Sequence, residues 1–515
     1  MLFSSIPFLY YFLPATVISY FLISWCVEKV FIAAGAQRET AHKASIFTKN
    51  TILLLFSLLF YGWGEPICMF LMIVTILVAW GTGWMVGISK TQGMKRFWTI
   101  LSVTISLGFL AIFKYADFFV DTFNDLANLN VPMLKDLPFV KQIPWLRQLL
   151  GSLPIGISFY TFQSMSYTID VYRGEVPVQK NPIYFGAYVT MFPQLIAGPI
   201  VRYRDVAREL NDRHHDWNRV ALGLRRFIIG LAKKIIIADG FALLTNIFRE
   251  SGGQSVVFYW MYAIAFAFNI YFDFSGYSDM AIGLGKMFGF NFIENFNYPY
   301  TSVTVAEFWR RWHMSLGSWF RDYVYIPLGG NRVGKGRWLF NTLAVWFLTG
   351  MWHGATWNFI LWGLLYFVCL VAEKWIPALQ KLPNWTRRVM TLTVVCLGFV
   401  LFNATGDKSL GADLPQATRD LIQAGKDFAG IFGFGGLPFI TAETVYYLRG
   451  FAVLFILGFV GCTPLVKNTA NRLLESKKLG TVAHVLEPIV LILLLLVCTG
   501  YLVDGSFSPF LYFRF

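Results

Sequence analysis

Residues 339–372 decide the fold of this chain, and they read LFNTLAVWFLTGMWHGATWNFILWGLLYFVCLVA. Apolar and aromatic residues fill both halves of the stretch, and His353 lies near its middle. About 20 apolar residues are needed to cross a bilayer, so the length suits two membrane helices. We therefore predict a helical hairpin with His353 near its turn.

The residues that flank this hairpin predict its orientation and the depth of the histidine. Basic stretches lie on both sides, at Arg332–Arg337 and Lys374–Arg388, and basic loops face the cytoplasm. From Trp338 to Gly350 a helix rises about 20 Å, against about 30 Å of hydrocarbon. His353 is thus expected inside the membrane, nearer the outer leaflet. An ionisable side chain at that depth is costly, which makes His353 a functional-site hypothesis.

The composition of the whole chain points to a multi-pass membrane protein. Hydrophobic residues make up 56% of its 515 residues and charged residues only 14%, well below the share in soluble domains. The net charge is +14, but the Lys and Arg residues cluster between apolar spans, which favours membrane topology over nucleic-acid binding. The six cysteines are scattered, so neither a disulfide framework nor a cysteine-based metal site is predicted.

The apolar stretches predict roughly 11 spans, and several of these are interrupted. Breaks fall at residues 62–66 (GWGEP) and 197–199 (AGP), and broken helices are tolerated only where protein or a water-filled cavity satisfies the backbone. The predicted fold is all-α: a polytopic helical bundle with broken and re-entrant helices around a central tunnel. We divide it into N-terminal helices (1–150), a core (151–375) and C-terminal helices with an outer aromatic tail (376–515).

Residues 301–322 form a second region of interest. Thr304 and Glu307 predict a capping box that opens a helix. Helical spacing would place His313 on an apolar face and Arg311 on another; that face comprises Trp309, His313, Leu316 and Phe320. Two interpretations stay open: an interfacial helix with arginine anchors, or a helix that delivers a second imidazole to the tunnel.

Other polar residues in apolar surroundings need partners. Asp273, with Ser275 beside it, ends an apolar span, and we expect an ion pair with the arginines of residues 310–321 or a place in the tunnel lining. The remaining histidines, among them His42 and His214, are interpreted as solvated or structural. No HExxH or similar spacing occurs, so no metal site is predicted.

Six ordered motifs stand out along the chain: PIGISFY (154–160), YTIDVYRG (167–174), PQLIAGP (193–199), residues 271–285, EFWRRWH (307–313) and MWHG (351–354). Together they resemble the membrane-bound O-acyltransferase (MBOAT) family, in particular its alginate and peptidoglycan O-acetylase branch. The resemblance implies transfer of an acyl group from a cytoplasmic thioester to a hydroxyl through a tunnel. It places the family's buried histidine at His353 and a second, usually polar, position at His313.

The resemblance also suggests a donor, a partner and a location. Acetyl-CoA would be the donor, and an extracytoplasmic transferase would pass acetyl groups to a cell-envelope polysaccharide outside a bacterial plasma membrane, whose lipid surrounds the protein. His353 would act as general base. Candidate tunnel and substrate contacts are Asn358, Trp352, Asp273, Ser275 and Arg311.

The C-terminal sequence SPFLYFRF (508–515) is predicted to lie outside. It is either an interfacial aromatic anchor or a tail whose Tyr512 takes the acyl group from the His353 site. Two other functions stay open. D-alanyl transfer to teichoic acids would use a carrier protein as donor, and a secondary transporter of a small anion would predict internal repeats, of which none is evident.

Overall fold

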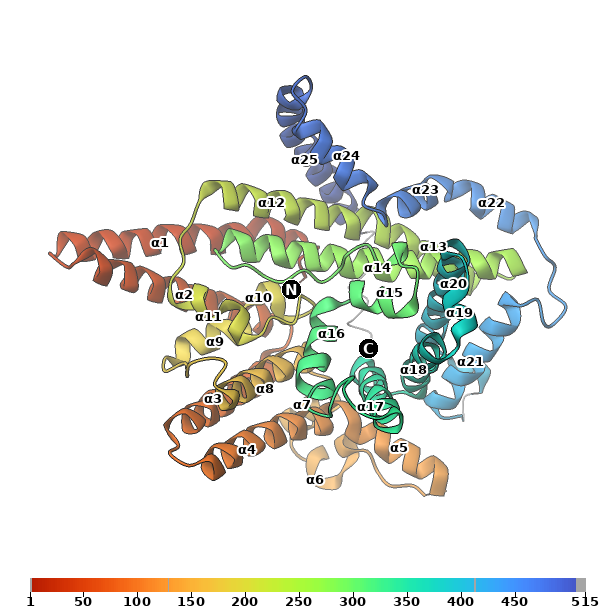
Figure 1. Ribbon diagram of the computed structural model, residues 1–515, viewed down its shortest axis with the longest axis horizontal. Coiled ribbons are helices and arrows are strands. Elements are labelled where there is room, and N and C mark those ends of the chain that lie inside the picture. The colour runs from red at the N-terminus through yellow and green to blue at the C-terminus, as the bar shows by residue number, and fades with distance from the viewer. Residues whose placement is uncertain (1, 128, 412–413, 506–515) are drawn as a thin grey trace. The chain divides into compact units, whose positions relative to one another are not determined.

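The computed structural model describes residues 2–127, 129–411 and 414–505, and within these ranges the regular elements are all helical (Figure 1). The chain divides into two compact units: Met1–Phe227 with Tyr277–Ile293, and Ile228–Gly276 with Glu294–Phe515. The prediction of an all-α polytopic membrane protein is confirmed. The three-segment division stays a prediction.

Eight helical stretches of the described residues are long and apolar enough to cross a membrane, or nine if a helix pair bent by 56° counts as one span. This is fewer than the roughly 11 expected. Some predicted spans are short or polar in the structure; α8 (Ile157–Arg173), for example, has only 17 residues. The spans are Pro7–Ala33, Arg38–Gly62, Pro66–Ile88, Gln92–Asp125, Val256–Met287, Trp357–Trp375, Asn384–Phe402 and Gly480–Val503, and the bent pair is Ala442–Gly450 with Ala452–Gly461.

The first unit is built from the N-terminal helices. α1 packs against α2, and α3 packs against both α4 and α8. The predicted break at residues 62–66 separates α2 from α3, which starts on Pro66, a residue suited to a first helical turn. The bounds are α1 (Leu13–Ala33), α2 (Arg38–Gly62), α3 (Pro66–Ile88), α4 (Gln92–Leu110), α5 (Ala116–Ala127), α6 (Pro138–Lys141), α7 (Pro144–Gly151), α8 (Ile157–Arg173), α9 (Pro182–Thr190), α10 (Phe192–Leu195) and α11 (Tyr203–Asn211).

The second unit holds the histidines. Its elements are η4 (Lys233–Ala238), α13 (Asp239–Glu250), α15 (Val305–Arg311), α16 (Met314–Phe320), η6 (Arg321–Tyr325), α17 (Lys335–His353), α18 (Trp357–Trp375), α19 (Pro377–Lys381), α20 (Asn384–Phe402), α21 (Gln416–Ile431), α22 (Ala442–Gly450), α23 (Ala452–Gly461), α24 (Leu465–Leu474) and α25 (Gly480–Val503). Two helices have residues in both units: α12 (Trp217–Ala232) and α14 (Val256–Met287).

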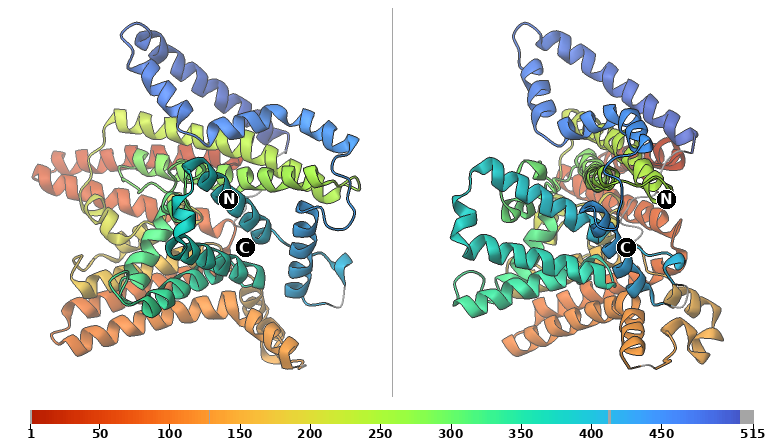
Figure 2. Two further views of the ribbon diagram at one scale, coloured as in Figure 1. Left: turned by 45° about the vertical axis from the view of Figure 1, so that its right-hand side comes forward. Right: turned by 90° about the vertical axis from the view of Figure 1, so that its right-hand side faces the viewer.

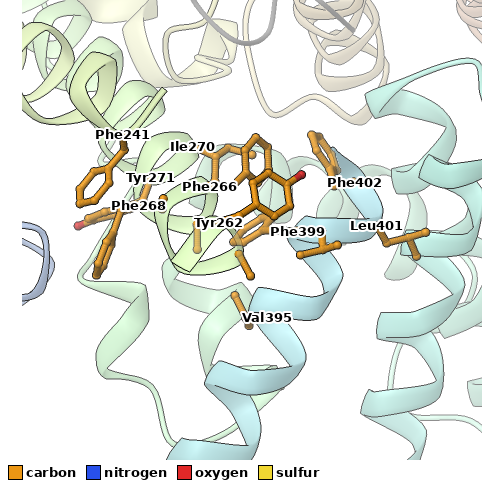
Figure 3. Packing of buried hydrophobic residues seen from close by; sticks show 14 of the residues in the cluster. Phe241, Tyr262, Phe266, Phe268, Ile270, Tyr271, Val395, Phe399, Leu401 and Phe402 are labelled. Atoms are coloured by element: carbon orange, nitrogen blue, oxygen red, sulfur yellow. The ribbon is translucent and has the colours of Figure 1, made fainter. Parts of the chain in front are cut away.

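An aromatic core joins α14 to α20 within the second unit (Figure 3). Side chains such as Tyr262 and Phe266 of α14 pack beside Phe399 and Phe402 of α20. Burial of such rings contributes about 1.5–3 kcal/mol each. In contrast, α24 and α25 meet at their connecting turn and diverge from it (Figure 2). Most apolar side chains of α25 are exposed, which suits a span in contact with lipid.

The predicted hairpin is confirmed: α17 and α18 pack side by side and are joined by Gly354–Thr356 (Figure 1). Two glycines permit the close approach. A Cβ atom added at Gly363 of α18 would lie 2.4 Å from the carbonyl oxygen of Trp346, and one at Gly350 of α17 would lie 2.5 Å from that of Phe359. Small residues at such contacts let membrane helices pack backbone to backbone.

Replacing Gly363 by Ala should therefore destabilise the protein by about 1–3 kcal/mol, because the new methyl group meets backbone atoms that cannot move alone. Gly425→Ala is the matched control, since a Cβ atom at that position of α21 meets nothing within 4 Å. The control should be stabilised by about 0.5–1 kcal/mol through helix propensity. Thermal unfolding of both purified variants in one detergent measures the difference, and equal melting temperatures would contradict the packing argument.

Candidate active site

A cavity of about 780 Å³ lies within the second unit. Trp338 and His353 of α17, fifteen residues apart, both line it, so it follows this helix for about 22 Å. The lining residues are Thr304, Ala306, Trp309, Arg310, Trp312, His313, Leu316, Gly317, Phe320, Arg321, Tyr325, Asn331, Trp338, Thr342, Val345, Trp346, Thr349, His353, Leu370, Glu373, Lys374, Gln380 and Arg387.

The cavity lining carries an excess of positive charge. Four cations line it, Arg310, Arg321, Lys374 and Arg387, against one lining carboxylate, that of Glu373, although Arg321 also pairs with Asp322 outside the lining (2.7 Å). Glu373 accepts hydrogen bonds from the backbone N–H groups of Val305 (2.6 Å) and Ala306 (3.1 Å), so its charge is directed at the start of α15. Lys374 Nζ lies 3.6 Å from the ring centroid of Trp338, which places both at the base of the hairpin.

His353 lies at the other end of α17 as the last residue of that helix, with only 5% of its surface exposed. Its imidazole is surrounded by aromatic rings: the centroids of Trp352, Trp362 and Phe402 lie 5.0, 4.9 and 5.3 Å away. The hairpin turn, a neighbouring helix and the end of α20 therefore hold one imidazole in a largely apolar setting beside the cavity.

The helix expected across residues 304–320 is broken in two. Thr304 Oγ1 accepts from the N–H of Glu307 (3.0 Å) as a capping box requires, but the Glu307 carboxylate accepts from Val303 rather than from Thr304. α15 ends at Arg311 and α16 begins at Met314. The expected apolar face still forms, since Trp309, His313, Leu316 and Phe320 all line the cavity.

His313 lies at this break in a left-handed conformation, with φ 46° and ψ 54°. Such a conformation costs a residue with a side chain about 1–3 kcal/mol and is concentrated at functional sites. The strained turn directs the His313 imidazole, which is 98% buried, into the cavity lining. Its ring also contacts the rings of Phe274 (centroids 4.7 Å apart) and Trp352 (5.7 Å).

The hydrogen bonds of His313 fix its tautomer. The backbone N–H of Ser315 can only donate, and it points at the same Asn295 atom (3.3 Å) that lies 3.0 Å from His313 Nδ1, so this atom is the carbonyl oxygen Oδ1. His313 Nδ1 must then carry the proton and donate it, leaving Nε2 with a lone pair. Burial lowers the pKa of His313 to about 3, so the ring is neutral at physiological pH.

His313 Nε2 is buried and has no hydrogen-bond partner among the described residues, and the same holds for the indole nitrogen of Trp309. Both side chains line the cavity. One offers an acceptor and the other a donor, and buried polar groups of this kind commonly mark catalytic or ligand-binding positions.

The carboxylates have other partners than expected. The predicted pairing of Asp273 with the arginines of residues 310–321 is wrong: Asp273 Oδ1 lies 2.9 Å from Lys234 Nζ, which also lies 2.7 Å from Asp239. In the first unit, Asp279 pairs with Arg226 at 2.8 Å. Asp273 and Asp279 of α14 are thus each paired with a cation from the preceding helical segments, Lys234 of η4 and Arg226 of α12.

Several predicted tunnel contacts lie outside the cavity lining. Arg311 pairs with Glu307 (2.7 Å), while Asp273 and Ser275 are buried in α14. Asn358 donates its amide hydrogens to the carbonyl oxygens of Phe402 (3.4 Å) and Ala404 (3.3 Å), which holds the start of α18 against the end of α20. Trp352 does not line the cavity, but its ring contacts both histidines. Tyr512 lies outside the described residues.

Sequence reasoning missed Asn295 and a polar clamp beyond α20. Arg249 of α13 makes two 2.6 Å bonds to the carboxylate of Asp427 in α21 and also donates to the hydroxyl of Tyr262 (2.5 Å). Asn403 donates to the same hydroxyl (2.9 Å), so the clamp reaches the residue after Phe402. An Asp in an amphipathic helix gives no sequence signal for such a partner.

Comparison with known proteins identifies the family of this chain. Residues 67–410 match the model of MBOAT, the membrane-bound O-acyltransferase family. The probable alginate O-acetylases AlgI of Azotobacter vinelandii and Pseudomonas aeruginosa are 36% and 40% identical over 91% and 78% of this chain, and 95% and 72% of their own lengths. A peptidoglycan O-acetyltransferase of Helicobacter pylori is 31% identical over 78% of this chain and 77% of its own. The chain belongs to the membrane-bound O-acyltransferase family.

Proposed function

We propose that this acyltransferase moves acetyl groups from cytoplasmic acetyl-CoA across a bacterial plasma membrane, for O-acetylation of a cell-envelope polysaccharide. The observation that carries the proposal is the single cavity that joins a cationic lining to two buried histidines. The names of the relatives, which act on alginate and peptidoglycan, support a polysaccharide as final acceptor.

The cationic lining suits the donor. Coenzyme A carries phosphates at one end of a long flexible arm and the thioester at the other. Lys374 and Arg387 would bind the phosphates at the base of the hairpin, which the basic flanks predict to be cytoplasmic. The arm would then follow α17 and bring the thioester to His353.

The two histidines suit the transfer step. His353 would accept the proton of the attacking hydroxyl while the hydroxyl oxygen forms a bond to the thioester carbon. The C–S bond then breaks, and the departing thiolate takes that proton from the imidazolium. His313 Nε2 would accept a hydrogen bond from another donor group of the acceptor molecule and so orient it, and the indole N–H of Trp309 would stabilise the oxyanion. The step uses only the thioester, the hydroxyl and these side chains, and assigns no role to a metal.

The acceptor would approach from outside, where a separate extracytoplasmic transferase passes acetyl groups on to the polymer. The relay role of Tyr512 stays a prediction from sequence, with an interfacial anchor as its alternative. A D-alanyl donor or simple anion transport would use the same membrane location, so the donor experiment below separates these functions.

His353→Ala should abolish acetylation, with a rate loss of at least about 100-fold, because general base catalysis contributes about 10²–10⁴-fold. Mass spectrometry of envelope polymers from cells that carry either form measures the acetate content. His484→Gln, a change at an exposed histidine of α25, is the matched control and should retain wild-type content. Membrane extraction yields must be equal, and wild-type acetate in His353→Ala would refute the catalytic role.

Lys374→Ala should raise the KM for acetyl-CoA about tenfold with little change in kcat, because a charge-assisted hydrogen bond to phosphate contributes about 1.5–3 kcal/mol in ground and transition state alike. Arg387→Ala should do the same, which guards against a packing effect at Trp338. Lys381→Ala, an exposed lysine outside the cavity lining, is the control. Radiolabelled acetyl-CoA with membranes provides the assay, and no acetyl transfer from it by the wild type would favour another donor.

Asn295→Ala should lower the transfer rate about tenfold, because the hydrogen bond that holds the His313 tautomer is lost. Asn295→Asp keeps an acceptor oxygen at the same place and should recover most of the activity. The effect should fall on kcat rather than on the KM for the donor. If both variants lose activity equally, Asn295 has a packing role instead.

A further inference from the structure

A second constellation of reactive side chains lies in the first unit and shares no residue with the cavity. His42, Asp212 and His214 place three metal-ligating atoms within 4.8 Å of one another. Asp212 Oδ1 lies 2.9 Å from His42 Nε2 and 3.8 Å from His214 Nε2. The two imidazole rings are stacked, with centroids 5.4 Å apart and planes inclined by 17°. Only the fold brings His42 to the other two, so no sequence spacing could reveal the group.

The backbone explains why these side chains converge. His42 lies near the start of α2, and Asp212 and His214 lie in the segment between α11 and α12. Asp212 is extended (φ −153°, ψ 119°), so neighbouring side chains alternate in direction. Arg213 points inward, where it donates to Tyr20 Oη and Asn50 Oδ1, both at 2.8 Å. The buried arginine therefore fixes the outward direction of its two neighbours.

We propose that His42, Asp212 and His214 bind a divalent transition-metal ion of the zinc type, with water completing its coordination. Zinc takes histidine nitrogen and carboxylate oxygen at about 2.0–2.2 Å, which sets tetrahedral donors about 3.3 Å apart. The distances of 2.9 and 3.8 Å lie on either side of this value, and all three atoms lie within 4.8 Å of one another, so the two accessible imidazoles need to turn out of their parallel stack to direct their nitrogens at one ion. Imidazole donors favour Zn²⁺, Co²⁺ or Ni²⁺ over Mg²⁺ and Ca²⁺.

The charges around the site are compatible with a cation of moderate affinity. Asp212 contributes one carboxylate, whose Oδ1 lies 2.9 Å from His42 Nε2. The positive charge of Arg208 also interacts with this carboxylate and would repel a bound cation. Lys43 is paired with Glu39 at 2.6 Å. With one carboxylate and two neutral imidazoles, the site should bind less tightly than a cysteine-rich structural zinc site.

All three ligands are accessible, since the side chains of His42, Asp212 and His214 are 31%, 59% and 83% exposed. A bound ion would tie α2 to the α11–α12 segment, whose Arg213 already contacts α1 and α2. It would thus reinforce one corner of the first unit. Because the transfer residues lie in the second unit, loss of the metal and loss of acyl transfer can be measured separately.

Co²⁺ titration of the full chain tests the proposal directly. The protein is purified in detergent through an affinity tag without histidines, stripped with a chelator and titrated with Co²⁺. One equivalent should bind with visible d–d absorption, and Zn²⁺ should displace it. His42→Gln and His214→Gln should each weaken binding at least about 100-fold, because even loss of an outer-shell partner costs about 10–100-fold. His484→Gln is the matched control and should bind like wild type.

Two results would overturn the proposal: no stoichiometric Co²⁺ or Zn²⁺ binding by the wild-type protein, or binding that persists in the His42→Gln/His214→Gln double variant. Either would leave an ordinary surface ion pair only. Circular dichroism and gel filtration confirm that the variants fold, and Asp212→Asn provides a third, independently placed substitution. Acetyl transfer by the variants, assayed in parallel, shows whether the two sites act independently.

Discussion

The close packing of α17 against α18 is the constraint on which the candidate active site depends. Gly350 and Gly363 allow the two backbones to approach, and this sets the direction in which the side chains of α17 point. One stripe of that helix, from Trp338 to His353, lines the cavity. A wider separation would move His353 away from Trp362 and would open the cavity wall along its length. The position of the His353 imidazole therefore depends on the two glycines.

The hairpin could be predicted from sequence because its signals are local: two apolar runs, a short polar turn and basic flanks. The face that carries His313 could be predicted too, but not the break in its helix. Neither Gly nor Pro occurs at residues 312–313, and the left-handed turn is stabilised by Asn295, which is distant in sequence. The predicted partner of Asp273 was wrong for a similar reason: the sequence offers many cations, and only the packing of the fold selects Lys234.

The strain at His313 has a physical explanation in the demands of proton chemistry. A regular helix would keep His313 on the same apolar face but would give its backbone, and so its ring, a different direction. The turn instead directs Nδ1 to an amide oxygen, which fixes the tautomer and exposes Nε2 to the cavity. Because a fixed tautomer keeps the acceptor atom in one place, about 1–3 kcal/mol of backbone strain is offset by a better oriented site.

The distribution of charge separates structural ion pairs from a ligand site. Away from the cavity, three cations are paired with nearby acids: Lys234 with Asp239 and Asp273, Arg249 with Asp427, and Arg226 with Asp279. Along the cavity, Arg321 is paired with Asp322 (2.7 Å), while Arg310, Lys374 and Arg387 share one lining carboxylate, which is directed at a helix start. Positive charge that few acids balance attracts anions even where the side chains are exposed or half-buried, as these are. Its concentration in this one place is understandable if an anionic ligand supplies the missing charge, which is what a phosphate-bearing acyl donor would do.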